Sequence, residues 1–248
     1  MRKTYEALEH AEKEYQAKRH GTSHEVPRPG LARPSRRAST HLAIGWYEDL
    51  KTSLLTRHPN GSIKSILFTA TAIGEGCSTT AINFAASLAR DSHFKVLIVD
   101  ANLSIPSFRE IFDIDHTLNL SDLLAGNDQK TRKIKRVGPG NLYVLPCSGN
   151  HSEPIALLES KRFGQLLKIV REKFDYLIMD GPPVLRFSES RVLATKVDGV
   201  VLVIESGKTR HQVALRAKKQ IEEAGGQLLG VFLNRKKYYI PDFIYRRL

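Results

Sequence analysis

Glycine, serine and threonine residues gather in the segment Thr71–Thr80, which follows an apolar run and precedes a helical pattern. A strand, a glycine turn and a helix N-terminus direct several backbone N–H groups and the positive end of the helix dipole toward one point. Glycine lets this backbone approach a phosphate closely, and a hydroxyl in the first helical turn, here Ser78, is placed to bind Mg²⁺. The pattern predicts a nucleotide-binding loop formed by Gly74, Glu75, Gly76, Cys77, Ser78 and Thr79.

The loop lacks the lysine that completes such a motif, because Gly76-Cys77-Ser78 stands where Gly-Lys-Ser or Gly-Lys-Thr is expected. No other lysine occurs between Lys64 and Lys95. A charge-assisted hydrogen bond contributes roughly 1.5–3 kcal/mol, so we expect ATP or ADP with Mg²⁺ to bind weakly. A cysteine at a helix N-terminus can also ionise readily, and an ionised Cys77 would be reactive and would place negative charge beside the phosphates.

The chain of 248 residues is long enough for one sizeable core, or for one core with tails. Its 41% of hydrophobic and 26% of charged residues are ordinary for a globular protein. Apolar runs reach only strand length, well below the roughly 20 residues of a membrane span. Residues 1–20 are charged throughout and lack the apolar centre of a signal peptide. We therefore expect a cytoplasmic protein.

The charge and the cysteine count leave alternatives open. A net charge of +12 suits nucleic acid or an anionic membrane surface, and it equally fits a solvated basic surface. Two cysteines are too few for a disulfide framework or a zinc cluster. We expect Cys147 to be a small, buried apolar side chain, as free cysteines commonly are.

Continuous runs of Val, Ile and Leu indicate strands that are covered on both faces. The expected strands are Ser65–Thr69, Lys95–Asp100, Leu142–Pro146, Tyr176–Asp180, Gly199–Glu205 and Leu228–Leu233. Apolar residues spaced i, i+3, i+4 indicate helices between them. The expected helices cover 81–89, 157–170, 187–194 and 211–224. This alternation predicts an α/β fold, a doubly wound, mostly parallel sheet flanked by helices, of the phosphate-loop type.

The two ends of the chain differ in composition from its middle. Residues 1–41 combine prolines with arginines and few apolar residues, which predicts a flexible basic tail. Within that tail, Thr4–Arg19 could form a charged helix with a thin apolar stripe. We expect the nucleotide-binding domain at residues 42–237 and a tyrosine-rich tail at residues 238–248.

Four further segments, taken in order, resemble the motifs of one family. Val96–Pro106 is similar to the second Walker-type motif of the bacterial tyrosine kinases, and Tyr176–Pro183 is similar to their Walker B strand with its Pro-Pro turn. Val231–Arg235 resembles their adenine-binding strand end, and Lys236–Tyr245 resembles their tyrosine cluster. The resemblance extends from about residue 42 to the end. Wider relatives are the partition and septum-site ATPases.

The resemblance implies an ATP-dependent kinase that works with a membrane-anchored polysaccharide co-polymerase, a regulator of chain length, in exopolysaccharide or capsule synthesis and export. It implies a peripheral position at the inner face of the plasma membrane, and a homo-oligomeric ring in which each subunit phosphorylates its neighbour. The implied site comprises Asp100, Asn102 and Asp180 as catalytic positions, Ser78, Asp100 and Asp180 as Mg²⁺ ligands, Asn234 and Arg235 beside adenine, and Tyr238, Tyr239 and Tyr245 as phosphate acceptors.

The departures from the family pattern all concern charge. The second acid of the family's Asp-x-Asp-x-Arg-x-Pro motif is Asn102 here, which cannot take up a proton at neutral pH. The arginine is Ser104, the loop lysine is Cys77, and Glu189 stands where the family often has aspartate. Since phosphoryl transfer depends on positioning and charge stabilisation, we expect Mg²⁺-ATP chemistry to be weak or absent.

The family's ring motif, Glu-x-x-Arg-x-x-Arg before the first strand, is also weakened. Its three positions are Gly45, Glu48 and Lys51 in this chain. Two of the three charges are therefore lost or reversed, and ring assembly should be weakened.

Other interpretations remain for each of these features. Asp100 and Asp180 could cap strand ends, Asn234 could be a turn residue, and the tyrosine-rich tail could dock on a partner. The whole chain could be a non-catalytic regulator that binds a nucleotide or a partner. It could also be a partition-type ATPase, although Ala72 stands at the position of that group's signature lysine. We do not expect nucleic acid as a partner.

Overall fold

The structure, a computed structural model, describes residues 39–57, 62–90, 94–112, 114, 119–126, 134–138, 140–147, 151 and 153–236. The strands are β1 (Ser65–Ala70), β2 (Val96–Asp100), β3 (Lys135–Arg136), β4 (Leu142–Leu145), β5 (Tyr176–Asp180), β6 (Gly199–Glu205) and β7 (Leu228–Asn234). The helices are α2 (Ser39–Arg57), α3 (Cys77–Arg90), α4 (Phe108–Phe112), α5 (Leu120–Ala125), α6 (Pro154–Glu159), α7 (Lys161–Lys173), α8 (Glu189–Ala194) and α9 (His211–Glu223).

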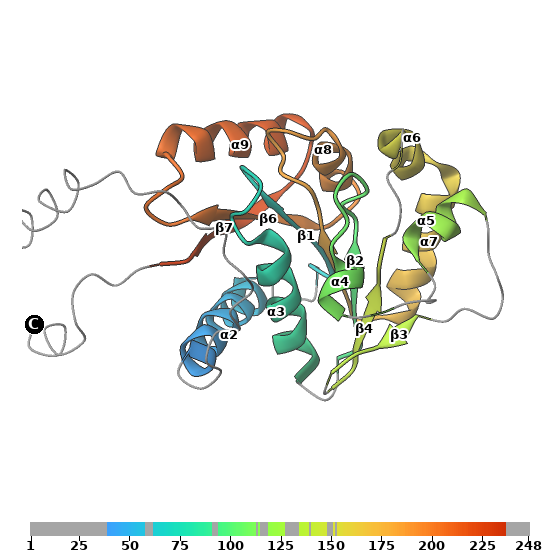
Figure 1. Ribbon diagram of the computed structural model, residues 1–248, viewed down its shortest axis with the longest axis horizontal. Helices are drawn as coiled ribbons and strands as arrows, with labels where there is room; N and C mark the ends of the chain where they lie inside the picture. The colour runs from blue at the N-terminus through green and yellow to red at the C-terminus, as the bar shows by residue number, and fades with distance from the viewer. Residues whose placement is uncertain are drawn as a thin grey trace, which may run out of the picture. The chain divides into compact units, whose positions relative to one another are not determined.

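The strands form one seven-stranded sheet in the order β3-β4-β2-β5-β1-β6-β7 (Figure 1). Neighbouring strands run parallel, except that β3 pairs antiparallel with β4. From β1 the chain passes to β2 on one side of the sheet and later to β6 and β7 on the other. The predicted α/β fold with a doubly wound, mostly parallel sheet is confirmed.

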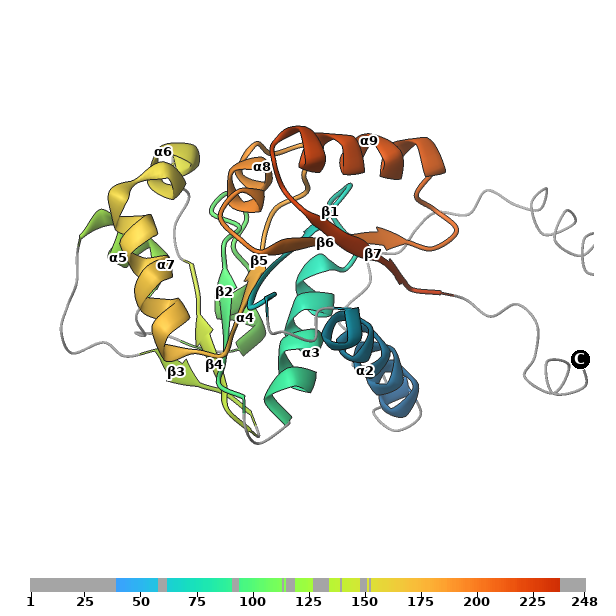
Figure 2. The same cartoon turned by 180° about the vertical axis from the view of Figure 1, so that it is seen from behind.

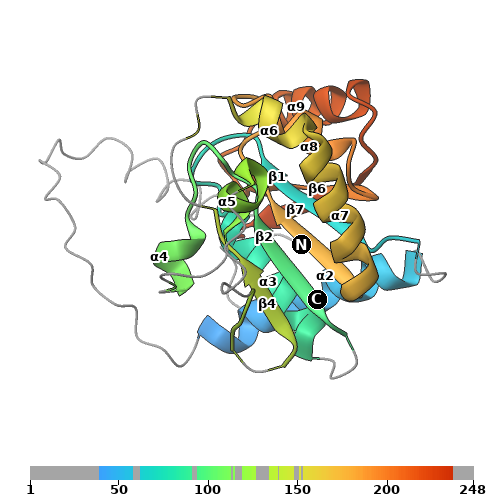
Figure 3. The ribbon, with the colours of Figure 1, turned by 90° about the vertical axis from the view of Figure 1, so that its right-hand side faces the viewer.

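Two hydrophobic cores lie on opposite faces of this sheet, since successive side chains of a strand point to opposite sides. Ile66 and Phe68 of β1 pack beneath α3, where the rings of Phe68 and Phe84 are 5.2 Å apart. Leu67 packs in the core of the other face. Figures 2 and 3 show α2 and α3 on one side of the strands and α8 and α9 on the other. This double cover explains the continuous apolar runs in the central strands.

Some element boundaries differ from the sequence prediction for local reasons. The single helix expected at 157–170 is divided into α6 and α7 at Ser160, whose hydroxyl accepts a hydrogen bond from the Phe163 N–H at 3.2 Å and caps α7. Strand β3 was not predicted, because Lys135 and Arg136 are exposed and form no apolar run. Helix α2 begins at Ser39, inside the tail expected at residues 1–41.

The prediction for Cys147 is confirmed, since its side chain is fully buried. The possible helix Thr4–Arg19 and the tail at residues 238–248 lie outside the described residues. In the part of the chain that the structure describes, no helix has both the length and the apolar character needed to cross a bilayer.

The carboxyl ends of β1, β2, β5, β6 and β7 open on the same edge of the sheet, because these strands are parallel. Segments after such ends commonly form the ligand site of an open α/β sheet. Asp100 and Asp180, at the ends of β2 and β5, are paired in register. The fold thus gathers the predicted motifs at one edge.

Candidate functional site

The loop between β1 and α3 has the sharp bend that its glycines predict. Gly74 and Gly76 have φ angles of +89° and +86°, in the left-handed region that glycine adopts without strain. Helix α3 begins directly at Cys77, and the Gly76 carbonyl accepts hydrogen bonds from the Thr80 N–H at 2.9 Å and its hydroxyl at 2.8 Å. The first N–H groups of α3 lack partners within the helix, which makes the loop an anion-binding position.

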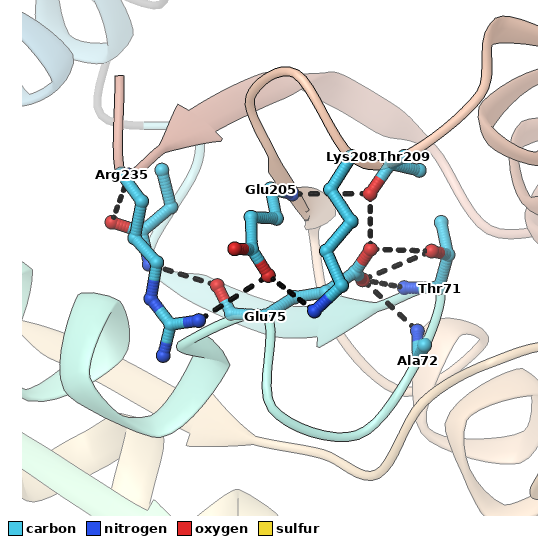
Figure 4. Close-up of polar contacts among 8 residues, drawn as sticks. Thr71, Ala72, Glu75, Glu205, Lys208, Thr209 and Arg235 are labelled. Atoms are coloured by element: carbon cyan, nitrogen blue, oxygen red, sulfur yellow. Dashed lines mark hydrogen bonds and ion pairs between the residues drawn. The ribbon is translucent and has the colours of Figure 1, made fainter. Parts of the chain in front are cut away.

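The buried carboxylate of Glu75 closes this loop from the inside. It accepts hydrogen bonds from the Thr71 N–H at 2.7 Å, from the Ala72 N–H at 2.9 Å, and from the Thr71 hydroxyl at 2.8 and 2.9 Å. The hydroxyl of Thr209, in the loop before α9, donates to the same carboxylate (Figure 4). Sequence analysis assigned Glu75 to nucleotide binding, but its side chain holds the loop backbone, which leaves its N–H for a phosphate.

The end of β7 supports the same loop from a second direction. The side-chain amide of Asn234 donates to the Glu75 carbonyl at 2.8 Å, and its amide oxygen accepts from the Arg235 N–H at 2.9 Å. One oxygen of Glu205 pairs with Lys208 Nζ at 3.0 Å and with Arg235 Nη1 at 3.2 Å (Figure 4). Hydrogen bonding to Lys208, together with the nearby Arg235, lowers the pKa of Glu205. Two cations therefore share one carboxylate next to the loop.

A cleft of about 320 Å³ opens beside the loop, within the size range of small-molecule sites. Segments that follow β1, β2, β5 and β7 all contribute to its wall. The lining contains Gly74, Glu75, Gly76, Cys77, Ser78, Thr79, Asn102, Gly181 and Arg235, together with Ile73, Ile105, Ser107 and Pro183. The structure therefore brings most of the predicted site positions to one cavity.

Asp100 caps α4. It is buried and accepts hydrogen bonds from the backbone N–H groups of Ser107 at 2.8 Å, Phe108 at 3.0 Å and Asn102 at 3.3 Å. Burial raises the pKa of Asp100 to about 6, although the three backbone donors oppose this rise. The capping role that sequence analysis left open is thus present for Asp100.

Asp180 has no comparable partners. Among the described residues, neither of its carboxylate oxygens accepts a hydrogen bond, although the side chain is fully enclosed. Burial raises the pKa of Asp180 to about 7; the nearby Ser78 hydroxyl opposes the rise, and the Asp100 carboxylate adds to it. Buried carboxylates ordinarily have partners, so this one is suited to a bound cation.

The two replaced positions of the second motif have structural contacts of their own. The Asn102 side-chain oxygen accepts a hydrogen bond from the Ile105 N–H at 3.0 Å. The Ser104 hydroxyl donates to the buried carboxylate of Glu189 at 2.5 Å. Contacts with Glu189, Thr209, Glu205 and Lys208 were missed by sequence reasoning, because isolated residues in loops and at helix starts carry no motif.

The prediction that Cys77 ionises readily is wrong. Removal of water from the thiol raises the Cys77 pKa well above its usual value, and the carboxylates of Asp180 and Glu75 raise it further. The positive end of the α3 dipole is therefore outweighed by two neighbouring acids and by burial. The thiol is neutral in the metal-free protein.

Other predicted positions fall at the margins of the structure. Tyr238, Tyr239 and Tyr245 lie outside the described residues. On α2, Lys51 Nζ and Glu48 Oε2 form an ion pair at 2.5 Å, so these two residues of the altered ring motif contact each other along the helix.

We predict that Gly76→Ala harms the loop more than Gly74→Ala does. Both glycines have positive φ, so alanine strains the backbone equally at either position. A Cβ at Gly76 would come within 2.1 Å of Asn234 Nδ2, whereas a Cβ at Gly74 meets nothing within 4 Å. Chemical unfolding should show a larger loss of stability for Gly76→Ala, and Asn234→Ala should abolish this difference. Equal losses for both variants would contradict the close contact.

We predict that Asp180→Asn gains stability over the parent protein as the pH rises. The folded-state pKa of about 7 lies above the unfolded value near 3.8, so the folded carboxyl resists ionisation. The wild type therefore loses stability between about pH 4 and pH 7, up to about 4 kcal/mol from this group. The uncharged variant should lack that loss. The measurement is urea unfolding in chelator at several pH values, and parallel curves for the two proteins would contradict it.

Comparisons with known proteins agree with this geometry. A model of the AAA domain family matches residues 63–223. Tyrosine-protein kinase YwqD of Bacillus subtilis is 32% identical over 191 residues, which cover 77% of this chain and 80% of that protein. The kinase domain of Escherichia coli tyrosine kinase ETK has a TM-score of 0.72 at 26% identity, covering 80% of this chain and 79% of the other.

A more distant likeness concerns the fold alone. The septum site-determining protein MinD of Pyrococcus horikoshii has a TM-score of 0.58 at 21% identity, covering 74% of this chain and 76% of the other. The matches in sequence are to tyrosine kinases, with the phosphate loop and both aspartates at one sheet edge. The chain belongs to the bacterial tyrosine-protein kinase family and is built on a phosphate-loop domain of the AAA type.

Proposed function

We propose that this chain is a nucleotide-binding homologue of the bacterial tyrosine kinases in which phosphoryl transfer is impaired. One observation carries the proposal: a neutral thiol, Cys77, stands in the lysine position of a loop whose backbone is otherwise complete. A loop of this kind can still position phosphates through its N–H groups, but it lacks the cation that stabilises charge during transfer.

The residues around the cleft fit a nucleotide with Mg²⁺. Backbone N–H groups of the phosphate loop would hold the phosphates, while Arg235 and Asn234 lie at the β7 end, where the family binds adenine. The Ser78 hydroxyl and the unpartnered Asp180 carboxylate would hold Mg²⁺, with Asp100 acting through water. When bound, Mg²⁺ would supply neutralisation of phosphate charge.

The remaining side chains supply little of the chemistry that transfer needs. The amide of Asn102 accepts no proton at neutral pH, so it cannot act as a general base for a tyrosine hydroxyl. Ser104 is uncharged, and its hydroxyl is already bonded to Glu189. With Cys77 neutral, three positions that manage charge in the family carry none here. Each such loss costs roughly a hundredfold or more in rate.

A non-catalytic regulator that binds a nucleotide or a partner is the second candidate. It is favoured by the hydrogen bonds of Asn102 and Ser104, because both replacements are integrated into the structure. A cleft that keeps its shape without its charges suits binding better than catalysis.

The proposal extends to the cellular role that the family implies. It comprises exopolysaccharide or capsule synthesis and export, a membrane-anchored polysaccharide co-polymerase as partner, and a peripheral position at the inner face of the plasma membrane. The exposed basic residues Lys135 and Arg136 on β3 would favour an anionic surface. The ion pair of Lys51 with Glu48 supports a weakened ring. Tyr238, Tyr239 and Tyr245 remain the proposed phosphate acceptors.

We predict that Cys77→Lys tightens binding of Mg²⁺-ADP by about tenfold or more, since it restores a charge-assisted contact to phosphate. Isothermal titration calorimetry on the folded variant measures the change. Cys77→Ala is the matched control and should leave the affinity close to that of the parent. If the lysine variant is folded and binds no tighter, the loop does not hold phosphate in the proposed position.

We predict negligible autophosphorylation of the parent protein, and recovery only when several charges return together. Cys77→Lys, Asn102→Asp and Ser104→Arg combined should exceed the sum of the three single variants, because residues that act as a unit are non-additive. The assay is transfer of labelled phosphate in Mg²⁺, with the modified tyrosines located by mass spectrometry. Strong labelling of the parent, abolished by Asp180→Ala, would falsify the impaired-kinase proposal.

A further inference from the structure

The Asp180 carboxylate is an unexplained charge in the interior. Its side chain is 1% exposed, and neither oxygen has a hydrogen-bond partner among the described residues. An isolated buried carboxylate is strongly disfavoured, so such a group is normally paired or bound to a metal ion. The position that carries a lysine in phosphate loops is occupied here by Cys77, which brings no positive charge.

The Cys77 thiol lies beside this carboxylate. Asp180 is its strongest charged neighbour, and the sulfur is 4.0 Å from the Gly181 carbonyl oxygen, directly after Asp180. Both groups border the cleft, whose wall includes Cys77, Ser78 and Gly181. A thiolate and a carboxylate side by side form a mixed sulfur–oxygen pair of ligands. Sulfur ligands favour Zn²⁺ and similar soft cations, whereas Mg²⁺ favours oxygen alone.

We propose that Cys77 and Asp180 bind a soft divalent cation of the Zn²⁺ type, which supplies the positive charge that the missing lysine would otherwise provide. On binding, the metal–sulfur bond forms, the S–H bond breaks and the proton passes to solvent. A dication with one thiolate carries a single net positive charge, the same as a lysine ammonium. The carboxylates that oppose a free thiolate attract a dication, so their effect is reversed.

The ligand set is incomplete by design of the cleft. No group of three or more His, Cys, Asp and Glu side chains able to hold a metal occurs in the described part of the chain. The protein therefore supplies two ligands, and water or phosphate oxygens from the cleft complete the coordination. Zinc sites that keep an open position of this kind are the catalytic or substrate-binding type rather than the structural type. This last step rests on the proposed nucleotide function.

The test uses Co²⁺ as a spectroscopic substitute for Zn²⁺ on the intact chain, first without nucleotide. The parent protein should develop the near-ultraviolet absorption of a cobalt–thiolate bond. Since the chain has two cysteines, Cys147→Ala is the matched control and should keep this band, whereas Cys77→Ser should lose it. Asp180→Asn should weaken Co²⁺ binding by about tenfold or more, because even the outer partners of metal ligands contribute that much.

The outcomes separate this inference from the proposed function. No thiolate band in the parent, or a band that persists in folded Cys77→Ser, overturns the site. In a second titration, Zn²⁺ should tighten ADP binding to the parent more than to Cys77→Ser, while in Mg²⁺ the two proteins should bind ADP alike. If Mg²⁺-ADP binds and no band appears, the inference fails alone. If the band appears and ADP binds with neither cation, the cation site stands and the nucleotide function fails.

Discussion

The hydrogen bonds to the Glu75 carboxylate determine the shape of everything around the cleft. Two backbone N–H groups, from Thr71 and Ala72, converge on one buried side chain that belongs to the same turn. They tie the start of the loop to its middle, so the curvature is fixed by a charge-assisted contact rather than by glycine freedom alone. The added contact from Thr209 links this turn to the segment before α9. A loop held in this way keeps its form whether or not a lysine follows it.

This arrangement separates two properties that phosphate loops usually combine. The geometry comes from backbone dihedrals and from Glu75, while the charge comes from a side chain that this protein has exchanged for Cys77. The exchange leaves Asp180 beside a thiol and a hydroxyl, with no cation to balance it in the described interior. The raised pKa of Asp180 is the electrostatic consequence of that exchange. Cations at the rim, Lys208 and Arg235, are instead paired with Glu205.

Much of the fold could be predicted because burial leaves a direct pattern in the sequence. Strands such as β5 and β6 are covered on both faces, so their apolar runs mark their limits correctly. Strand β3 could not be found, because an exposed edge strand of two basic residues has no such pattern. The break at Ser160 was hidden because the apolar spacing continues across it.

The candidate site shows the same division. Local motifs identified the phosphate loop and both aspartates, since glycine turns and strand-end acids stand close together in sequence. The contacts of Glu75 with Thr209 and of Ser104 with Glu189 join residues far apart in the chain, and no local pattern records them. The ionisation of Cys77 was predicted wrongly for this reason, because the deciding acid, Asp180, is brought to it only by the fold.

The contact between Asn234 and the Glu75 carbonyl has a consequence for how the protein is made. These residues are 159 positions apart, and β7 is the last strand in the sequence. Contacts of such long separation form late, since a large loop must close before they contribute. During synthesis the chain can pair its central strands well before β7 emerges from the ribosome. The cleft is therefore completed at the end of translation, and a chain that stops short of β7 would keep much of the sheet while leaving the loop without this support.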